Sequence, residues 1–588
     1  MHRLLTDYEP VYQQVSHTVF FLEHSNVFWQ PRWSLNSNVI DFLKNFSSTS
    51  MQDYEEFSEA QMRILERFVT HTTSNIFVLR NLPEVIKGAL FSRYSRSSLG
   101  LRSLLLKEFI QGEETAFEAI VGHDEDNPEK QMLAIHKAQN FYDRILDGYG
   151  DDSIGELGGA HLAVENISML AAKVLEDSRI GGSPLEKSTR YIYFDQKVKD
   201  QYLYYREPIL MTSAFRDIYT KTCDHLFETY SKLIPPLTEL MEKKFPKEQE
   251  KSKAAYTAAL RAKVLDCLRG LLPAGTLTNM GIFGNGRFWE SLINKLQCQN
   301  LVELQDIGKQ AFEELSKVIP SFVRRSEVHH KHHMAYAQFT ESMSEQLHNI
   351  AEHLKVTESP QKPGVKLIYA DPDGPYKVAA ALLYTHSPHS LDDLQKYCRT
   401  LPNEEIAKIF DAASSMRENR RHKSPRALEH AQFTFEIIAD FGIYRDLQRH
   451  RMLTQRRQVL TTAYGYWVPE EILDTPMEKA YHEAMEMAQE VHQRIAEELP
   501  EEAQYVVPMA YHMRWYFHVN LRALQWLCEL RSQAAGHPGY RLVAQEMASQ
   551  VSHALPLLEP FFKFVDYQGY NLGRLDQEQR KIDKNSSI

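Results

Sequence analysis

Arg449, His450 and Arg451 form a run of three cationic or hydrogen-bond-donating side chains. An alternating apolar segment, AQFTFEI over residues 431–437, predicts a half-buried strand, and a helical stretch leads from it to the run. Arginine suits phosphate because its planar guanidinium can donate two parallel charge-assisted hydrogen bonds. A solvated basic helix end would also explain the run taken alone. Its place after a strand and a helix favours a site for the phosphates of a cofactor or nucleotide.

The same order of features occurs twice along the chain. Each half has a helix, a turn ending in a carboxylate, a strand-like segment, a helix, a polar loop, a long amphipathic helix, a proline and an N-x-R triplet. The polar loops are residues 176–191 and 448–464, and the triplets begin at Asn285 and Asn520. Several matches in one order are hard to obtain by chance, so they indicate a duplicated domain.

The polar loops resemble the signature of the flavin-dependent thymidylate synthases, R-H-R-x-x-S-x-x-E-x-S-x-R-Y. The second half keeps the R-H-R run but departs from the later positions, with Thr454, Arg457, Val459 and Thr461. The first half lacks R-H-R and fits the later positions, with Ser183, Glu186, Ser188, Arg190 and Tyr191. Neither half has a complete motif, and each half keeps what the other lacks.

Two further arginines of the family are divided in the same sense. The arginine that precedes the proline, and that contacts the nucleotide in the family, is matched by Arg269 in the first half and replaced by Gln504 in the second. The arginine nine residues after N-x-R, held to polarise the uracil ring, is matched by Arg531 and replaced by Leu296 in the first half. The resemblance therefore implies one composite site to which both halves contribute, and fusion raises the effective concentration of the two contributions.

The resemblance implies reductive methylation of dUMP to dTMP. Methylenetetrahydrofolate would donate the carbon, reduced FAD the hydride, and NADPH would reduce the flavin. Arg531 is the implied catalytic residue. The implied substrate-binding residues are Glu186, Ser188, Arg190, Arg269, Arg449 and Arg531. The implied FAD-binding residues are His422, Ser424, Arg449, His450, Arg451, Asn520 and Arg522. Two chains would reproduce the family's four-domain assembly, so we expect a homodimer.

We expect an α+β fold of two tandem thymidylate synthase-like domains, each a mainly antiparallel sheet with long flanking helices. The expected domains are residues 61–356 and 365–575, the nucleotide-binding and FAD-binding halves. They are joined by a Pro- and Gly-containing linker at 357–364. Residues 1–60 are an expected N-terminal extension, residues 576–588 a polar tail, and 115–146 and much of 198–263 are helical insertions.

Composition excludes several function classes. The net charge of -11 argues against a general affinity for nucleic acid, which is bound mainly by neutralising phosphates. No run of 18 apolar residues predicts a membrane span, and five scattered cysteines suit a reducing, cytoplasmic compartment. The cluster from His329 to His333 could ligate a metal, but a polar helix end explains it as well, so we predict no metal site.

Two alternatives remain open. Asp446, where the family often has a glutamine that touches the nucleotide, together with Thr454 and Val459, allows a flavoenzyme that acts on a different pyrimidine nucleotide. A non-catalytic nucleotide-binding scaffold is the other alternative. Random decay should have removed both copies of some element, whereas each anchor survives in at least one half, and this favours an enzyme.

Overall fold

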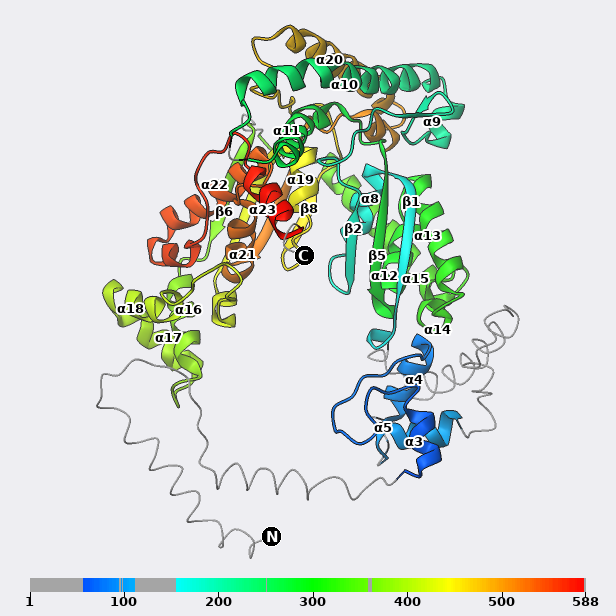
Figure 1. Ribbon diagram of the computed structural model, residues 1–588, viewed down its shortest axis with the longest axis vertical. Helices are drawn as coiled ribbons and strands as arrows, with labels where there is room; N and C mark the ends of the chain where they lie inside the picture. Colours follow the sequence, from blue (N-terminus) through cyan, green and yellow to red (C-terminus); the bar gives the residue numbers. More distant parts are fainter. Residues whose placement is uncertain are drawn as a thin grey trace, which may run out of the picture. The chain divides into compact units, whose positions relative to one another are not determined.

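The computed structural model describes residues 57–94, 97, 99–110, 155–249, 251–357 and 362–585 (Figure 1). The chain divides into two compact units, residues 1–81 with 102–106, and residues 82–101 with 107–588. Nearly all of the predicted extension, and the whole of the predicted insertion at 115–146, lie outside the described residues. The two sheets and the helices that accompany them belong to the larger unit.

The smaller unit contains the short helix α3 (Glu59–Leu65) and an isolated bridge between Val69 and Leu79. A reciprocal capping box starts α3, because the Ser58 side chain accepts from the backbone of Gln61 and the Gln61 side chain accepts from the backbone of Ser58. Within residues 82–110, as far as the structure describes them, the helices are α4 (Glu84–Tyr94), which belongs to the larger unit, and α5 (Leu101–Leu104) and the π-helix η2 (Leu105–Ile110), where the chain passes between the two units.

The first repeat is built on a three-stranded antiparallel sheet in the order β1-β5-β2. Its strands are β1 (Gly159–Ser168), β2 (Gly182–Glu186) and β5 (Leu277–Asn285), with a separate hairpin of β3 (Lys197–Val198) and β4 (Gln201–Tyr202). Its helices are α8 (Met169–Glu176), α9 (Pro208–Thr212), α10 (Arg216–Lys244), α11 (Lys253–Leu268), η4 (Arg269–Leu271), α12 (Gly286–Gln297), α13 (Val302–Leu315), α14 (Pro320–Val323), η5 (Arg324–Ser326) and α15 (Lys331–Glu352).

The second repeat is built on a four-stranded antiparallel sheet in the order β6-β7-β9-β8. Its strands are β6 (Gly364–Ala370), β7 (Gln432–Asp440), β8 (Thr454–Arg457) and β9 (His512–Asn520). Its helices are α16 (Gly374–Tyr384), α17 (Leu391–Thr400), α18 (Asn403–Ser414), η6 (Arg426–His430), α19 (Phe441–Leu447), α20 (Pro476–Ala496), η7 (Glu502–Val506), α21 (Leu521–Arg531), α22 (Pro538–Ala554), η8 (Pro556–Phe562) and α23 (Leu575–Asn585). The predicted α+β class is confirmed.

Equivalent residues begin equivalent helices in the two repeats. Ser168 and Asp440 are the last residues of the strands β1 and β7. Their side chains cap the helices that follow, α8 and α19. The side chains of Asn285 and Asn520, the first residues of the two N-x-R triplets, cap α12 and α21 in the same way. A cap of this kind satisfies a backbone N–H that the first turn leaves unpaired. The repeated residues thus occur in the same order in both halves because each lies where a strand ends and a helix begins.

The repeats join through their equivalent proline segments, which pair as antiparallel strands do. Pro273 bridges Pro508, the N–H of Ala274 donates to the oxygen of Val507 at 2.8 Å, and the N–H of Met509 donates to the oxygen of Leu272 at 2.9 Å. The long helices α10 and α20 pack against each other over this junction (Figure 1). Pairing of the same segment with itself is the geometry of a two-fold interface, here contained within one chain.

Candidate functional site

An inner cavity of about 560 Å³ lies in the second repeat, between the loop before η6, the end of α19 and helix α21. All seven residues predicted to bind FAD line it, from three separate stretches of sequence. They are His422, Ser424, Arg449, His450, Arg451, Asn520 and Arg522. The structure therefore brings together the predicted flavin residues.

Several residues that line the inner cavity form hydrogen bonds and ion pairs with one another. The guanidinium of Arg522 pairs with Glu429 at 2.7 Å and donates from Nε to the backbone oxygen of Ser424 at 2.9 Å. The Ser424 side chain is buried, and its Oγ has no hydrogen-bond partner among the described residues. A buried hydroxyl without a partner is costly, and a polar ligand in the cavity would satisfy it.

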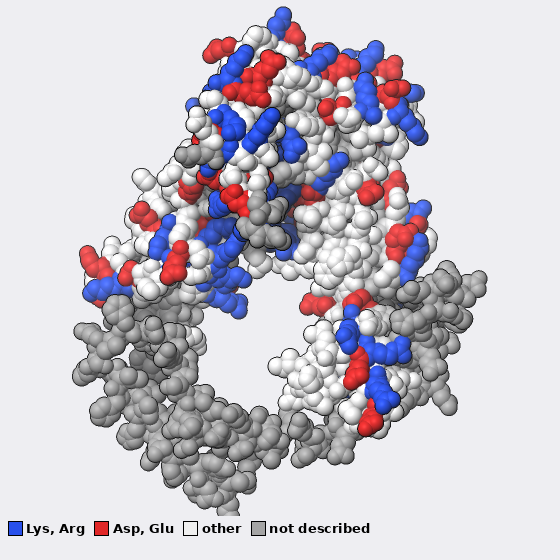
Figure 2. Space-filling view, in the orientation of Figure 1, with Lys and Arg blue, Asp and Glu red and all other residues white. Residues whose placement is uncertain are grey.

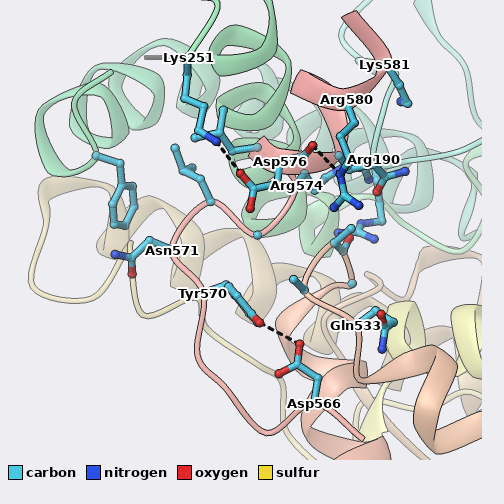
Figure 3. Close-up of a pocket in the computed structure, with 18 of the residues that line it drawn as sticks. Arg190, Lys251, Gln533, Asp566, Tyr570, Asn571, Arg574, Asp576, Arg580 and Lys581 are labelled. Carbon is cyan, nitrogen blue, oxygen red and sulfur yellow. Dashed lines mark hydrogen bonds and ion pairs between the residues drawn. The ribbon is translucent and has the colours of Figure 1, made fainter. Parts of the chain in front are cut away.

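An outer cavity of about 1510 Å³ adjoins the inner one and shares Arg420, Leu530 and Arg531 with it (Figure 3). Arg190 of the first repeat and Tyr540 at the start of α22 also line it. Of the implied substrate-binding residues, Arg190 and Arg531 thus face one space, and Arg531 stands at the boundary between the two cavities.

Arg531 is oriented by the R-H-R run. Its Nε donates to Nε2 of His450 at 2.9 Å, which requires an imidazole without a proton on Nε2. Burial, and next the positive charge of Arg531, lower the pKa of His450 well below its ordinary value. His450 is therefore neutral in the folded protein and serves as an acceptor for the predicted catalytic arginine.

The ring of Tyr540 contacts both Arg190 and Arg531. The guanidinium of Arg190 lies 5.8 Å, and that of Arg531 5.5 Å, from the centre of the Tyr540 ring. The Tyr540 hydroxyl is also within 3.2 Å of Nη1 of Arg190. An aromatic face attracts a cation within about 6 Å, so one tyrosine holds an arginine from each repeat.

Arg190 is already paired within the protein. Its guanidinium donates two parallel hydrogen bonds to the carboxylate of Asp266, at 2.6 and 2.7 Å, and both side chains are buried. Arg190 and the other nearby cations hold the pKa of Asp266 below its ordinary value, against the effect of burial. The backbone N–H of Arg190 donates to Oγ of Ser188 at 3.2 Å, so Ser188 shapes the loop that carries Arg190.

Glu186 lies outside both cavities, in a buried cluster of cations from the two repeats. Its carboxylate contacts Lys173 at 2.9 Å, Arg445 at 2.6 Å and Arg449 at 3.3 Å. Burial alone would raise its pKa, but Arg445, Lys173 and Arg449 together lower it to about 2. Glu186 is thus placed to position Arg449 from behind the inner cavity.

Arg269 lies outside both cavities as well. It pairs with Asp446 at 3.1 Å, and its Nη2 is buried without a partner among the described residues. Although burial would raise the pKa of Asp446, the charges of Arg269, Arg190, Arg449 and Arg531 lower it far below its ordinary value. The four arginines predicted to bind the substrate, from both repeats, therefore all act electrostatically on one carboxylate, which contacts Arg269 directly.

Sequence reasoning missed several residues of this arrangement. Arg420 and Trp526, which line the inner cavity with a cation–ring distance of 5.5 Å, match no motif. Tyr540 carries no local signature either. Asp266 had the only available signal, because it lies three residues before Arg269 on the helix that ends there.

The surface of the larger unit is uneven in charge. In Figure 2, acidic and basic side chains alternate over α10 and α20, whereas Lys and Arg side chains gather around α21.

Within the described part of the chain, no helix is long and apolar enough to cross a membrane.

Comparison with known proteins agrees with the duplication. The family model described as thymidylate synthase complementing protein matches the chain twice, over residues 110–321 and 366–557. A UPF0159 protein of Chlamydia muridarum is 59% identical over 527 residues, which cover 90% of this chain and 98% of that protein. A UPF0159 protein of Thermoplasma acidophilum is 33% identical over 528 residues, covering 85% and 99%.

A flavin-dependent thymidylate synthase of Clostridium tetani is 28% identical over 221 residues, which cover 33% of this chain and 84% of that protein. One such enzyme thus corresponds to about one repeat. The predicted resemblance and the two tandem domains are confirmed by the double match and by the shared order of elements. The chain belongs to the thymidylate synthase complementing protein family, as a fused tandem duplicate.

Proposed function

We propose that the protein is a flavin-dependent thymidylate synthase that converts dUMP to dTMP at one composite site built from both repeats. The observation that carries the proposal is the position of Arg531, which lines the inner cavity with the predicted flavin residues and the outer cavity with Arg190. The methyl carbon would come from methylenetetrahydrofolate, and NADPH would be the reductant of the flavin.

The residues of the inner cavity fit FAD. Its wall offers Arg449, Arg451 and Arg522 for the diphosphate, whose oxygens match guanidinium geometry. The orphaned Oγ of Ser424 offers a hydrogen bond to a polar group of the cofactor. Reduced FAD, when bound, supplies the hydride of the reaction.

The chain's own residues would bind and polarise the pyrimidine. Arg531 would stabilise the negative charge that develops on the ring, since a preorganised cation stabilises charge without reorganisation at the moment of reaction. His450 holds that guanidinium in place, and the ring of Tyr540 contacts both it and Arg190. Neither Glu186 nor Arg269 lines a cavity, so both would act as positioning residues. Glu186 would position Arg449, with which it pairs. Arg269 would position Asp446 in the same way.

One observation favours a second candidate, a flavoenzyme that acts on another pyrimidine nucleotide. Asp266 and Asp446 already pair with Arg190 and Arg269. Asp446 lines neither cavity and stands where the family often has a glutamine that touches the nucleotide. An ionised carboxylate accepts hydrogen bonds and donates none, whereas a glutamine does both, so the change alters the hydrogen bonds available around Arg269 and makes a ring with a donor, such as the amino group of cytosine, the alternative to test. Competition between dCMP and dUMP for the flavin spectral change separates the two candidates.

The visible absorption spectrum of the purified protein, with dUMP added anaerobically to the oxidised and reduced forms, tests the proposal. We expect bound FAD whose spectrum shifts with dUMP, and we expect both Arg190→Ala and Arg531→Ala to lose the shift. Arg63→Ala, at an exposed position in the smaller unit, is the control. A colourless protein that cannot be reconstituted with FAD would overturn the proposal.

A further inference from the structure

One wall of the outer cavity is formed by the C-terminal segment. Residues 566–584, which include most of α23, follow the second family match, which ends at residue 557. The segment is fastened to the first repeat: Lys251 pairs with Asp576 at 2.7 Å, and the backbone N–H of Ser252 donates to Gln579 at 2.8 Å. The chain thus continues past the family match into an element that reaches the candidate site.

The outer cavity is strongly basic. Its lining includes ten Lys and Arg side chains against three carboxylates, and Figure 3 shows Arg574, Arg580 and Lys581 of the C-terminal segment beside Arg190. Some of these charges are compensated, as in the pair of Lys581 with Glu578 at 2.9 Å. Lys244, Arg420, Arg421 and Arg580 form no ion pair with a carboxylate of the described residues.

This excess of charge is larger than one nucleotide phosphate needs. A single phosphate is satisfied by two or three cations with good geometry, and Arg190 is already engaged by Asp266. Several like charges gathered along one hollow raise its positive potential, so the hollow attracts an anionic ligand that extends over several of them. Their positions run from Arg531, at the inner cavity, to α23.

Resting on the proposed function, we propose that the outer cavity is a subsite for a polyanionic extension of one of the two substrates that meet beside Arg531. Arg420 and Arg531 lead from the ring site, and Arg580, Lys581 and Lys584 of α23 contact the far end of the extension. Two sources share this chemistry, an oligoglutamate tail on the folate donor and a second or third phosphate on the nucleotide.

Calorimetric titration of the FAD-loaded protein distinguishes the sources. One arm compares pentaglutamyl with monoglutamyl tetrahydrofolate, and the other compares dUTP with dUMP. We expect the longer ligand of one arm to bind at least about tenfold more tightly, since each charge-assisted contact is worth about one power of ten. We expect the advantage to shrink as salt rises from 0.05 to 0.5 M, because the contacts are solvent-exposed.

The triple variant Arg580→Glu, Lys581→Glu, Lys584→Glu tests whether the α23 wall of the outer cavity contacts the extension. All three side chains belong to exposed residues, so the variant should keep the fold, which thermal unfolding checks. We expect it to remove the advantage of the longer ligand while the affinity for the shorter one changes less than about threefold. The control makes the same charge change at exposed lysines on outer helices, with Lys396→Glu, Lys408→Glu and Lys479→Glu.

Equal binding of long and short ligands in both arms, or an advantage that survives the α23 variant, would overturn the subsite. Failure of the synthase proposal looks different, because it removes the effect of dUMP on the flavin spectrum. Titration with tripolyphosphate and with a pentaglutamate peptide distinguishes failure of the subsite from failure of the synthase proposal. If either probe binds the wild type and not the α23 variant, the subsite is supported even where dUMP has no effect. Absence of such binding counts against the subsite alone.

Discussion

Nε of Arg531 donates to Nε2 of His450 at 2.9 Å, and this bond joins the predicted catalytic residue to the predicted flavin-binding run. The two were predicted from separate motifs and lie 81 residues apart in the sequence, yet they are joined in the structure. A neutral imidazole accepts the bond, and the guanidinium is fixed at the boundary of the two cavities. The orientation of Arg531 therefore depends on an acceptor at position 450.

This dependence predicts different results for two substitutions of His450. His450→Gln retains an acceptor for Nε of Arg531, whereas His450→Leu removes it and leaves a half-buried donor unpaired, at a cost of about 1–3 kcal/mol. We expect the Leu variant to weaken dUMP binding about tenfold and the Gln variant less than about threefold. Titration of the flavin spectrum with dUMP measures both. Equal losses in the two variants would show that the acceptor has no such role.

A second prediction separates the structural role of Arg190 from its binding role. Removing one partner of a buried ion pair leaves an uncompensated charge and typically costs about 3–5 kcal/mol, whereas replacing both partners with apolar residues is often close to neutral. We expect Arg190→Leu to lower the free energy of unfolding by that amount, and the double variant with Asp266→Leu to recover at least half of it. Urea unfolding provides the measurement.

The double variant should fold and still fail to bind dUMP. Recovery of dUMP binding together with stability would show that Arg190 serves the fold alone. Asp266→Leu by itself provides the third corner of the cycle, from which the coupling between the two residues is obtained.

The sequence was sufficient for the duplication and for the inner cavity, because each motif marks a strand end or a helix start. Asn285 and Asn520 are both N-caps and motif residues, so their spacing carries structural information. The partners of the arginines could not be predicted in the same way. Asp266 meets Arg190 across 76 residues, and Tyr540 meets it across 350, and contacts so distant along the chain leave no local pattern.

The C-terminal segment could not be predicted for another reason. Residues 576–588 were expected to be a polar tail, and Leu575–Asn585 forms the helix α23. Its charged composition is that of a solvated segment, and its role follows only from the pairing of Asp576 with Lys251 and from the burial of Arg574 beside Tyr191. Contacts of charged residues with a distant part of the chain override what their composition indicates.

A third prediction concerns the junction of the repeats. The N–H of Gly275 donates to the backbone oxygen of Tyr505 at 2.8 Å, and a Cβ at position 275 would lie 2.9 Å from that oxygen. Gly275→Ala must therefore push the paired segments apart, and we expect it to destabilise the protein by about 1–3 kcal/mol. Gly281→Ala is the matched control, because a Cβ there meets nothing within 4 Å. Urea unfolding should show that Gly275→Ala is less stable than Gly281→Ala. Equal stabilities would show that the paired segments can move apart at no measurable cost.

The last prediction is a pH dependence due to His537, whose Nε2 lies 3.2 Å from the backbone oxygen of Asp266 and whose Nδ1 accepts from the N–H of Gly539. Burial, and next the charge of Arg269, lower its pKa to about 3, from about 6.5 in the unfolded chain. Between these values the unfolded state binds a proton that the folded state does not. Stability is therefore complete above pH 6.5 and falls as the pH falls toward 3, by about 1.4 kcal/mol for each unit.

Comparison with His537→Asn isolates this contribution, because the other titrating groups remain the same in both proteins. Asp440 works in the opposite direction, since burial raises its pKa to about 6, so the slope of the wild type alone would mislead. We expect the variant to be less stable at pH 7.5, because the hydrogen bonds of the imidazole are lost, and the difference between the two proteins to shrink by about 2–3 kcal/mol at pH 4.5. Urea unfolding at both values measures it, and a difference that stays constant with pH would show that His537 titrates normally.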